Sequence, residues 1–196
     1  MKTGRLEAFS DGVIAVIITI MVLELKVPHA GTPEALLTVA PSLLIYGLSF
    51  AVVAIFWVNH HHLMEKARQA SAALLWSNNL LLFWMSLIPF ATGYLGEHCH
   101  APLALVVYGS VFVLTSASYL LFQMVLSKQD PNDAARQLEF KKLNRKAAFS
   151  IGCYIASVAL AFVSVYASYA IFVMIPMLYF WPERKSRTGT EPAARF

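Results

Sequence analysis

The sequence predicts an all-α, polytopic membrane protein with six transmembrane helices and both termini in the cytoplasm. The first observation is composition. Of the 196 residues, 58% are hydrophobic and 13% are charged, whereas a soluble domain carries about 25% charged residues. The second observation is that the apolar stretches have the length of membrane spans. Nearly all basic residues fall in every second segment that connects these stretches. Together these features exclude a soluble enzyme and a disordered chain.

The first helix is expected at residues 6–27 and differs from the others. Only twelve residues between Asp11 and Glu24 are uncharged, and the helix also includes Glu7 and Lys26. Ionisable groups within a span are costly and usually face protein or water rather than lipid. We therefore expect the other helices to shield this helix and a cavity to border it. The alternative of a cleaved signal peptide is disfavoured by these charges and by the lack of a small-residue cleavage site.

The remaining helices follow from the stretches that lack charge. A span needs about 20 mostly apolar residues to cross roughly 30 Å of hydrocarbon. Such stretches place helices at 35–58, 73–95 and 102–127. The uncharged stretch 147–182 is too long for one ordinary span. It fits two short helices, 147–164 and 168–182, with a break near Ser164–Ser168.

Basic residues test this count, because cytoplasmic loops carry an excess of Lys and Arg. Six spans put fourteen of the fifteen basic residues on one side and only Lys26 on the other: Lys2 and Arg5; Lys66 and Arg68; Lys128, Arg136, Lys141, Lys142, Arg145 and Lys146; Arg184, Lys185, Arg187 and Arg195. The split requires an even number of spans with both ends inside. We expect one six-helix domain, residues 1–183, and a flexible cytoplasmic tail, 184–196.

The longest polar segment, 128–146, joins the fourth and fifth predicted helices. Residues 134–146 have the pattern of a basic amphipathic helix, with Leu138 and Leu143 on its weak apolar side. Two interpretations apply to this segment: a solvated linker that lies on anionic headgroups, which is favoured, or a motif that binds a partner.

Two constellations on the first helix could carry function. Arg5, Phe9, Ser10 and Asp11 open it. Arg5 and Asp11 are six residues apart and face different directions, so each pairs with another helix or anchors the helix end at the interface. Further along, Val16, Ile20 and Leu23 share one face, with Ala15 and Thr19 beside them. This stripe is either helix packing or the wall of an ion path, where apolar rings gate by dewetting and a Thr hydroxyl contacts the ion.

Polar residues on the second and third helices suggest structural roles. Adjacent helical side chains point about 100° apart, so His60–His62 cannot chelate one metal ion together. Residues 98–100, which hold further His and Cys, fall on the other side of the membrane. We therefore expect no metal site, and we expect His60 to hydrogen-bond within a polar network, with proton sensing as an open alternative. Asn78 and Asn79 are expected to join helices by hydrogen bonds.

Other functional classes find little support in the sequence. Residues 92–96 read Thr-Gly-Tyr-Leu-Gly, which differs from the Thr-Val-Gly-Tyr-Gly filter of ordinary potassium channels. We expect a loop there. The nucleotide-binding, hydrolase and metalloprotease motifs are missing, which indicates that the protein is not an enzyme and needs no cofactor. Topology accounts for the excess of basic residues, so nucleic acid is not an expected partner.

The motif Arg5-x-x-x-Phe9-Ser10-Asp11 resembles the signature that opens the first helix in the transmembrane protein 175 family of potassium channels. Trp57-x-x-His60 and the stretch from Asn79 to Pro89-Phe90 also resemble the bacterial members. The resemblance covers most of the chain, with one six-helix unit as in bacterial members rather than the two of vertebrate members.

The resemblance implies a potassium-permeable homotetramer in the bacterial inner membrane, with the first helix of each subunit lining a central pore. Val16, Ile20 and Leu23 take the constriction positions, and Thr19 takes a selectivity position with Ala15 beside it. The family usually has Ile or Leu where Val16 stands, so the narrowest ring lies at Val16 or passes to Ile20 or Leu23. The resemblance also implies a structural polar network that holds the first helix and is made by Arg5, Phe9, Ser10, Asp11, Trp57 and His60.

Expected partners are further copies of the chain and membrane lipids, with K⁺ as the permeant ion. Two alternatives remain open from the residues. One is a proton-coupled secondary transporter that uses His60 and Asp11. The other is a membrane scaffold that conducts nothing.

Overall fold

A computed structural model describes residues 3–180, and this part of the chain is helical and contains no strand. The helices are α1 (Thr3–Leu23), α2 (Pro33–Thr38), α3 (Ala40–Met64), α4 (Ala72–Met85), α5 (Ile88–Glu97), α6 (Pro102–Ser127), α7 (Ala134–Leu160) and α8 (Val165–Phe180). The expected tail, residues 184–196, lies outside the described residues. The prediction of an all-helical fold is confirmed for residues 3–180.

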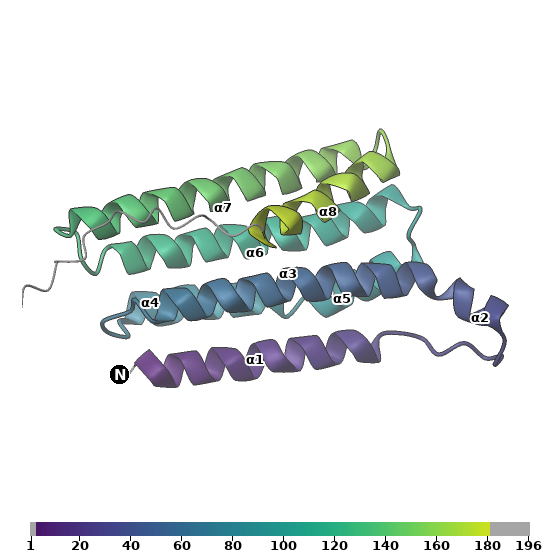
Figure 1. Ribbon diagram of the computed structural model, residues 1–196, viewed down its shortest axis with the longest axis horizontal. Helices are drawn as coiled ribbons and strands as arrows, with labels where there is room; N and C mark the ends of the chain where they lie inside the picture. The colour runs from purple at the N-terminus through teal and green to yellow at the C-terminus, as the bar shows by residue number, and fades with distance from the viewer. Residues whose placement is uncertain (1–2, 181–196) are drawn as a thin grey trace, which may run out of the picture.

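The long helices lie side by side along the longest axis of the molecule (Figure 1). Helix α1 forms one edge and packs against α3, α4 and α5. Helix α7 forms the opposite edge and packs against α6 and α8. Because α1 has neighbours on one side only, its other face remains uncovered.

Four segments are long and apolar enough to cross a membrane: α1, α3, the α4–α5 pair and α6. The C-terminal α8 is apolar but shorter, and α7 begins with a highly charged half. A multi-pass membrane protein is therefore established, while the full count of six spans remains a prediction. The N-terminus of α1 lies at the same end as loops 65–71 and 128–133, as expected from the charges (Figure 1).

The third predicted helix, 73–95, is interrupted rather than continuous. Helix α4 ends at Met85 and α5 begins at Ile88, with Pro89 in its first turn. Proline lacks the N–H donor, and its ring clashes with the carbonyl four residues earlier, which here belongs to Met85. The second predicted helix also differs, because residues 33–38 form the separate α2 and α3 runs from Ala40 to Met64. His60–His62 therefore lie on the last turns of a helix.

The expected amphipathic helix at 134–146 is not a separate element. It is the first half of α7, which starts where the Asp133 side chain accepts a hydrogen bond from the Arg136 N–H at 3.0 Å. Phe140, rather than the expected Leu138, is the buried apolar residue of this segment. The interpretation as a solvated linker is wrong, because the segment is part of a helix that packs against α6.

Ion pairs fix the start of α7 against the loop between α3 and α4. Asp130 pairs with Arg136 at 2.5 Å and with Arg68 at 2.8 Å, and Lys66 pairs with Glu139. Asp130 is buried, so its two cationic partners compensate the cost of removing its charge from water. These contacts join two loops that are about 60 residues apart in the sequence.

Gly109 on α6 lies where side chains of α7 and α8 pack closely against the α6 backbone. A Cβ atom at this position would overlap Cγ2 of Val158 and lie 3.0 Å from Cζ of Phe172. We expect Gly109→Ala to lower the free energy of unfolding by about 1–3 kcal/mol, because the helices would have to separate. The matched control is Gly152→Ala on α7, where nothing lies within 4 Å of the added carbon.

The control should leave stability unchanged or raise it by up to about 1 kcal/mol, because Ala favours a helix over Gly. Equal stability of both variants in a detergent unfolding titration would contradict the packing argument.

Candidate functional site

The first part of the candidate site is a buried chain of hydrogen bonds that joins α1, α3 and α4. Asn78 on α4 donates through Nδ2 to Ser10 Oγ on α1 at 3.0 Å, and Ser10 Oγ donates to the Leu6 carbonyl at 2.9 Å. His60 on α3 donates through Nε2 to Asn78 Oδ1 at 2.8 Å. All three side chains are buried. A buried polar group without a partner is costly, so this chain fixes α1 in register against two neighbours.

Two more polar contacts lie beside this chain and are more exposed. Trp57 Nε1 donates to Asp11 Oδ1 at 2.9 Å. One helical turn closer to the N-terminus, Glu7 Oε1 lies 2.9 Å from Nδ1 of His61. Together with the buried chain, these contacts tie residues 6–11 of α1 to residues 57–61 of α3 and to Asn78 of α4.

The structure brings together four of the six residues expected in a polar network: Ser10, Asp11, Trp57 and His60. The other two lie apart. Arg5 and Phe9 are on the exposed face of α1, and 56% of the Phe9 surface is accessible. In a single subunit these two residues therefore do not contribute to the hydrogen-bonded cluster, and their roles remain predictions.

The second part of the candidate site is the uncovered face of α1. Leu6, Ser10, Ile14, Ile17 and Met21 form the buried face. The residues singled out from the sequence lie on the exposed face: Ala15, Val16, Thr19, Ile20 and Leu23. Leu23 is 81% exposed, Val16 54% and Ile20 42%. The only hydroxyl of this set, that of Thr19, donates to the Val16 carbonyl at 2.8 Å, which leaves its oxygen lone pairs available to a cation.

The far end of α1 adjoins a pocket of about 230 Å³ lined by residues of α3 and α5 and by the segment that follows α1. Glu24, Lys26 and Glu97 are its charged residues. Lys26 Nζ lies 2.6 Å from Glu97 Oε1. The Glu97 carboxylate raises the pKa of Lys26 above its usual value by accepting this hydrogen bond and through its negative charge.

The segment 92–96, expected as a loop, is helical and belongs to α5. Its carbonyls are engaged in a helix and cannot line an ion filter. Thr92 instead donates to Ser49 Oγ at 2.8 Å, and Ser49 Oγ lies 3.0 Å from the Tyr108 hydroxyl. This second buried chain ties α5 to α3 and α6 on the side remote from the exposed face of α1.

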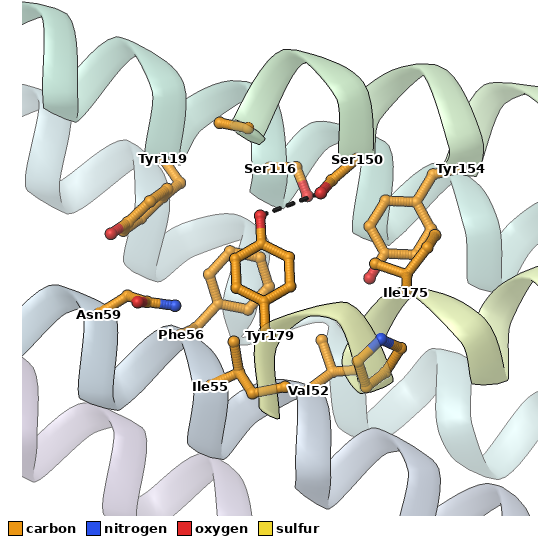
Figure 2. Close-up of a pocket in the computed structure, with 12 residues that line it drawn as sticks. Val52, Ile55, Phe56, Asn59, Ser116, Tyr119, Ser150, Tyr154, Ile175 and Tyr179 are labelled. Carbon is orange, nitrogen blue, oxygen red and sulfur yellow. Dashed lines mark hydrogen bonds between the residues drawn. The ribbon is translucent and has the colours of Figure 1, made fainter. Parts of the chain in front are cut away.

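A small cavity of about 30 Å³ lies between α3, α6, α7 and α8, away from α1. Figure 2 shows the Tyr179 hydroxyl directed to Ser150, at 2.9 Å, with Asn59 and Tyr119 on the opposite side. The volume has room for about one or two water molecules and for no larger ligand. In residues 3–180, no group of three or more His, Cys, Asp and Glu side chains is placed to hold a metal ion.

Asn78 is the central member of the hydrogen-bonded cluster, but the sequence analysis does not assign it to that cluster. The sequence does contain a signal, because a buried amide in a span demands a partner. It does not distinguish Asn78, which is buried, from its exposed neighbour Asn79. Choosing between adjacent residues requires the rotation of α4 about its axis.

Comparisons with known proteins agree on one family. The sequence model of the protein family described as endosomal/lysosomal potassium channel TMEM175 matches residues 5–89. A potassium channel of Chryseobacterium sp. is 36% identical over 186 residues, which cover 94% of this chain and 96% of the relative. A potassium channel of Chamaesiphon minutus is 34% identical, with 91% and 93% of the two chains covered.

A solved structure gives the same result. The crystal structure of a lysosomal potassium-selective channel TMEM175 homolog from Chamaesiphon minutus aligns with a TM-score of 0.79 at 33% identity. The alignment covers 90% of this chain and 95% of that one. The human endosomal/lysosomal proton channel TMEM175 is 33% identical over 103 residues, which cover 46% of this chain and 20% of the human protein.

Proposed function

Because this chain belongs to the TMEM175 family of ion channels, we propose that it is a homotetrameric, potassium-permeable cation channel whose ion path is lined by α1. The resemblance drawn from the Arg5-to-Asp11 motif is thus confirmed at the level of the family. The family is one of ion channels rather than of enzymes.

The observation that carries this proposal is the uncovered face of α1. In a single subunit, Val16, Ile20 and Leu23 are exposed at the edge of the molecule, while the opposite face of the same helix is buried. The helix starts among the ionisable residues Glu7 and Asp11, and such groups disfavour exposure to lipid. Four copies of this face around an axis would form a wall shielded from lipid.

In such a ring, each apolar residue appears four times at one level. Rings of Val16, Ile20 and Leu23 would lie about one turn apart, and an apolar ring admits water and ions only when it is wide enough. Thr19 would place four hydroxyl oxygens between two of these rings, with the small Ala15 one turn away. In this arrangement selectivity would come from pore width and from these oxygens, because 92–96 are helical.

The hydrogen-bonded cluster has a supporting role in this proposal. Ser10, Asp11, Trp57 and His60 hold α1 against α3 and α4 and would set the distance of each α1 from the axis. Their contacts are made on or beside the buried side of α1 rather than on the face that would meet the ion. Arg5 and Phe9, which are exposed, would complete the network through contacts between subunits.

The proposed topology has six spans, α1, α3, α4–α5, α6, α7 and α8, with both termini in the cytoplasm. Residues 1–183 would form the channel domain and 184–196 its tail. The location would be a bacterial inner membrane, as suggested by the bacterial relatives. Partners would be three further copies of the chain and lipids, with K⁺ as the permeant ion and no cofactor.

Transporter activity through His60 and Asp11 is not favoured. The two side chains bind different partners, Asn78 and Trp57, and do not share a hydrogen bond. The relatives described above are named as channels.

Recording from the purified protein in planar bilayers tests the proposal. Unitary currents that reverse at a potential set mainly by K⁺ are expected, with a particle mass of four chains in lipid nanodiscs. Saturable proton-linked flux without unitary currents would establish a transporter instead. A monomer, or a folded tetramer without flux, would overturn the proposal.

A further inference from the structure

A groove between α6 and α7 combines an apolar floor with a cationic rim. It encloses about 530 Å³ and is lined at its apolar part by Leu120, Met124, Phe140 and Ala148. Its polar residues are Ser127, Gln137, Lys141, Asn144 and Arg145. None of the lining residues is acidic.

The two cations of the groove act together. Lys141 and Arg145 are one helical turn apart on α7, so their side chains lie on the same side of the helix. The nearby acidic residues are engaged elsewhere: Asp130 pairs with Arg68 and Arg136, and Glu139 pairs with Lys66. The groove is therefore left with a positive charge that complements an anion.

The lengths of the helices place the groove at the depth of lipid headgroups. Helix α7 has 27 residues, about 40 Å at 1.5 Å per residue, so it is longer than the roughly 30 Å hydrocarbon core. Its apolar half begins after Lys146, and α6 ends at Ser127 beside the groove. Gln137 on α7 is level with Ser127 on α6, to whose carbonyl it donates a hydrogen bond. Lys141 and Arg145 thus lie where hydrocarbon gives way to headgroups, and Leu120 and Met124 lie beside them on the antiparallel α6.

We propose that this groove binds one phospholipid with an anionic headgroup from the surrounding leaflet. Lys141 and Arg145 bind the lipid phosphate, with charge-assisted hydrogen bonds from the Arg guanidinium. The acyl chains cover Leu120 and Met124, of which Met124 is 45% exposed without a lipid. Basic pockets between membrane helices recognise anionic lipids by this combination of charge and apolar contact. The inference does not depend on whether the protein conducts ions.

Native mass spectrometry of the delipidated full-length protein in detergent tests the proposal, with phosphatidylglycerol and phosphatidylcholine as probes. The wild type should bind phosphatidylglycerol in preference. The double variant Lys141→Gln/Arg145→Gln should bind it at least about tenfold more weakly, because each cation near a membrane contributes about 1 kcal/mol. The control Lys128→Gln/Lys142→Gln removes the same charge outside the groove and should bind as the wild type does.

A second variant separates charge from folding. Lys141→Arg/Arg145→Lys keeps both charges and should retain the preference for phosphatidylglycerol. Loss of binding in this variant, an equal loss in the control pair, or wild-type affinity of the double Gln variant would each overturn the proposal. Competition by inorganic phosphate at the concentration of the lipid would overturn it as well, because the groove would then recognise the free anion rather than the lipid.

Discussion

Replacing Ile20 by alanine is expected to raise the unitary potassium conductance about twofold or more and to reduce the preference for K⁺ over Na⁺. Ile20 is 42% exposed on the uncovered face of α1, between Val16 and Leu23. In a tetramer, the change removes four apolar groups from one level of the pore, which widens the ring and lowers the cost of hydrating it. Single-channel recording with K⁺ on one side and Na⁺ on the other measures both quantities.

The matched control is Ile155→Ala. Ile155 is 53% exposed on α7, at the opposite edge of the molecule from α1. The same side-chain atoms are removed there, so conductance and selectivity should stay as in the wild type. If the two variants behave alike, α1 does not line the ion path, and the assignment of Val16, Ile20 and Leu23 is wrong.

Replacing Asn78 by alanine is expected to lower the free energy of unfolding by about 2 kcal/mol, because Ser10 and His60 then lose their shared partner inside the protein. Asn78 accepts from His60 at 2.8 Å and donates to Ser10 at 3.0 Å. Unfolding in mixed detergent micelles, followed by circular dichroism, measures the loss. A weaker hold on α1 should also reduce the yield of tetramer in nanodiscs.

Asn79→Ala provides the comparison, because Asn79 is the exposed neighbour on the same helix. Its removal leaves no buried group unpaired, and we expect stability within about 0.5 kcal/mol of the wild type. If both variants lost stability equally, the hydrogen-bonded cluster would not account for the effect, and helix propensity would not either, because Ala favours a helix over Asn.

Several boundaries could be predicted from the sequence because their signals are local. The fourth predicted helix, 102–127, matches α6, since Pro102 suits a first helical turn and Lys128 follows the apolar stretch. The break inside 147–182 was expected near Ser164–Ser168 and falls at residues 161–164, so it overlaps the expected position at Ser164. The stripe of Val16, Ile20 and Leu23 follows from helical periodicity alone, and these residues do share a face in the structure.

Other predictions failed where contacts between distant segments decide. Residues 134–146 were expected as a separate linker but form the first half of α7, because Arg136 and Glu139 form ion pairs with other segments and Phe140 is buried. The interruption of 73–95 is a different case, because its cause, Pro89, is local and visible in the sequence.

The sequence by itself determined that the protein lives in a membrane and that its first apolar helix is flanked by more ionisable residues than the others. It also predicts that the basic residues sort to one side. These properties depend on composition and on the order of residues along one chain. Only the tertiary structure decided that α1 lies at an edge, that Asn78 rather than Asn79 is buried, and that the stripe on α1 is the uncovered face. The reason is physical: periodicity defines which residues share a face, but the rotation of each helix is set by packing and buried hydrogen bonds with its neighbours.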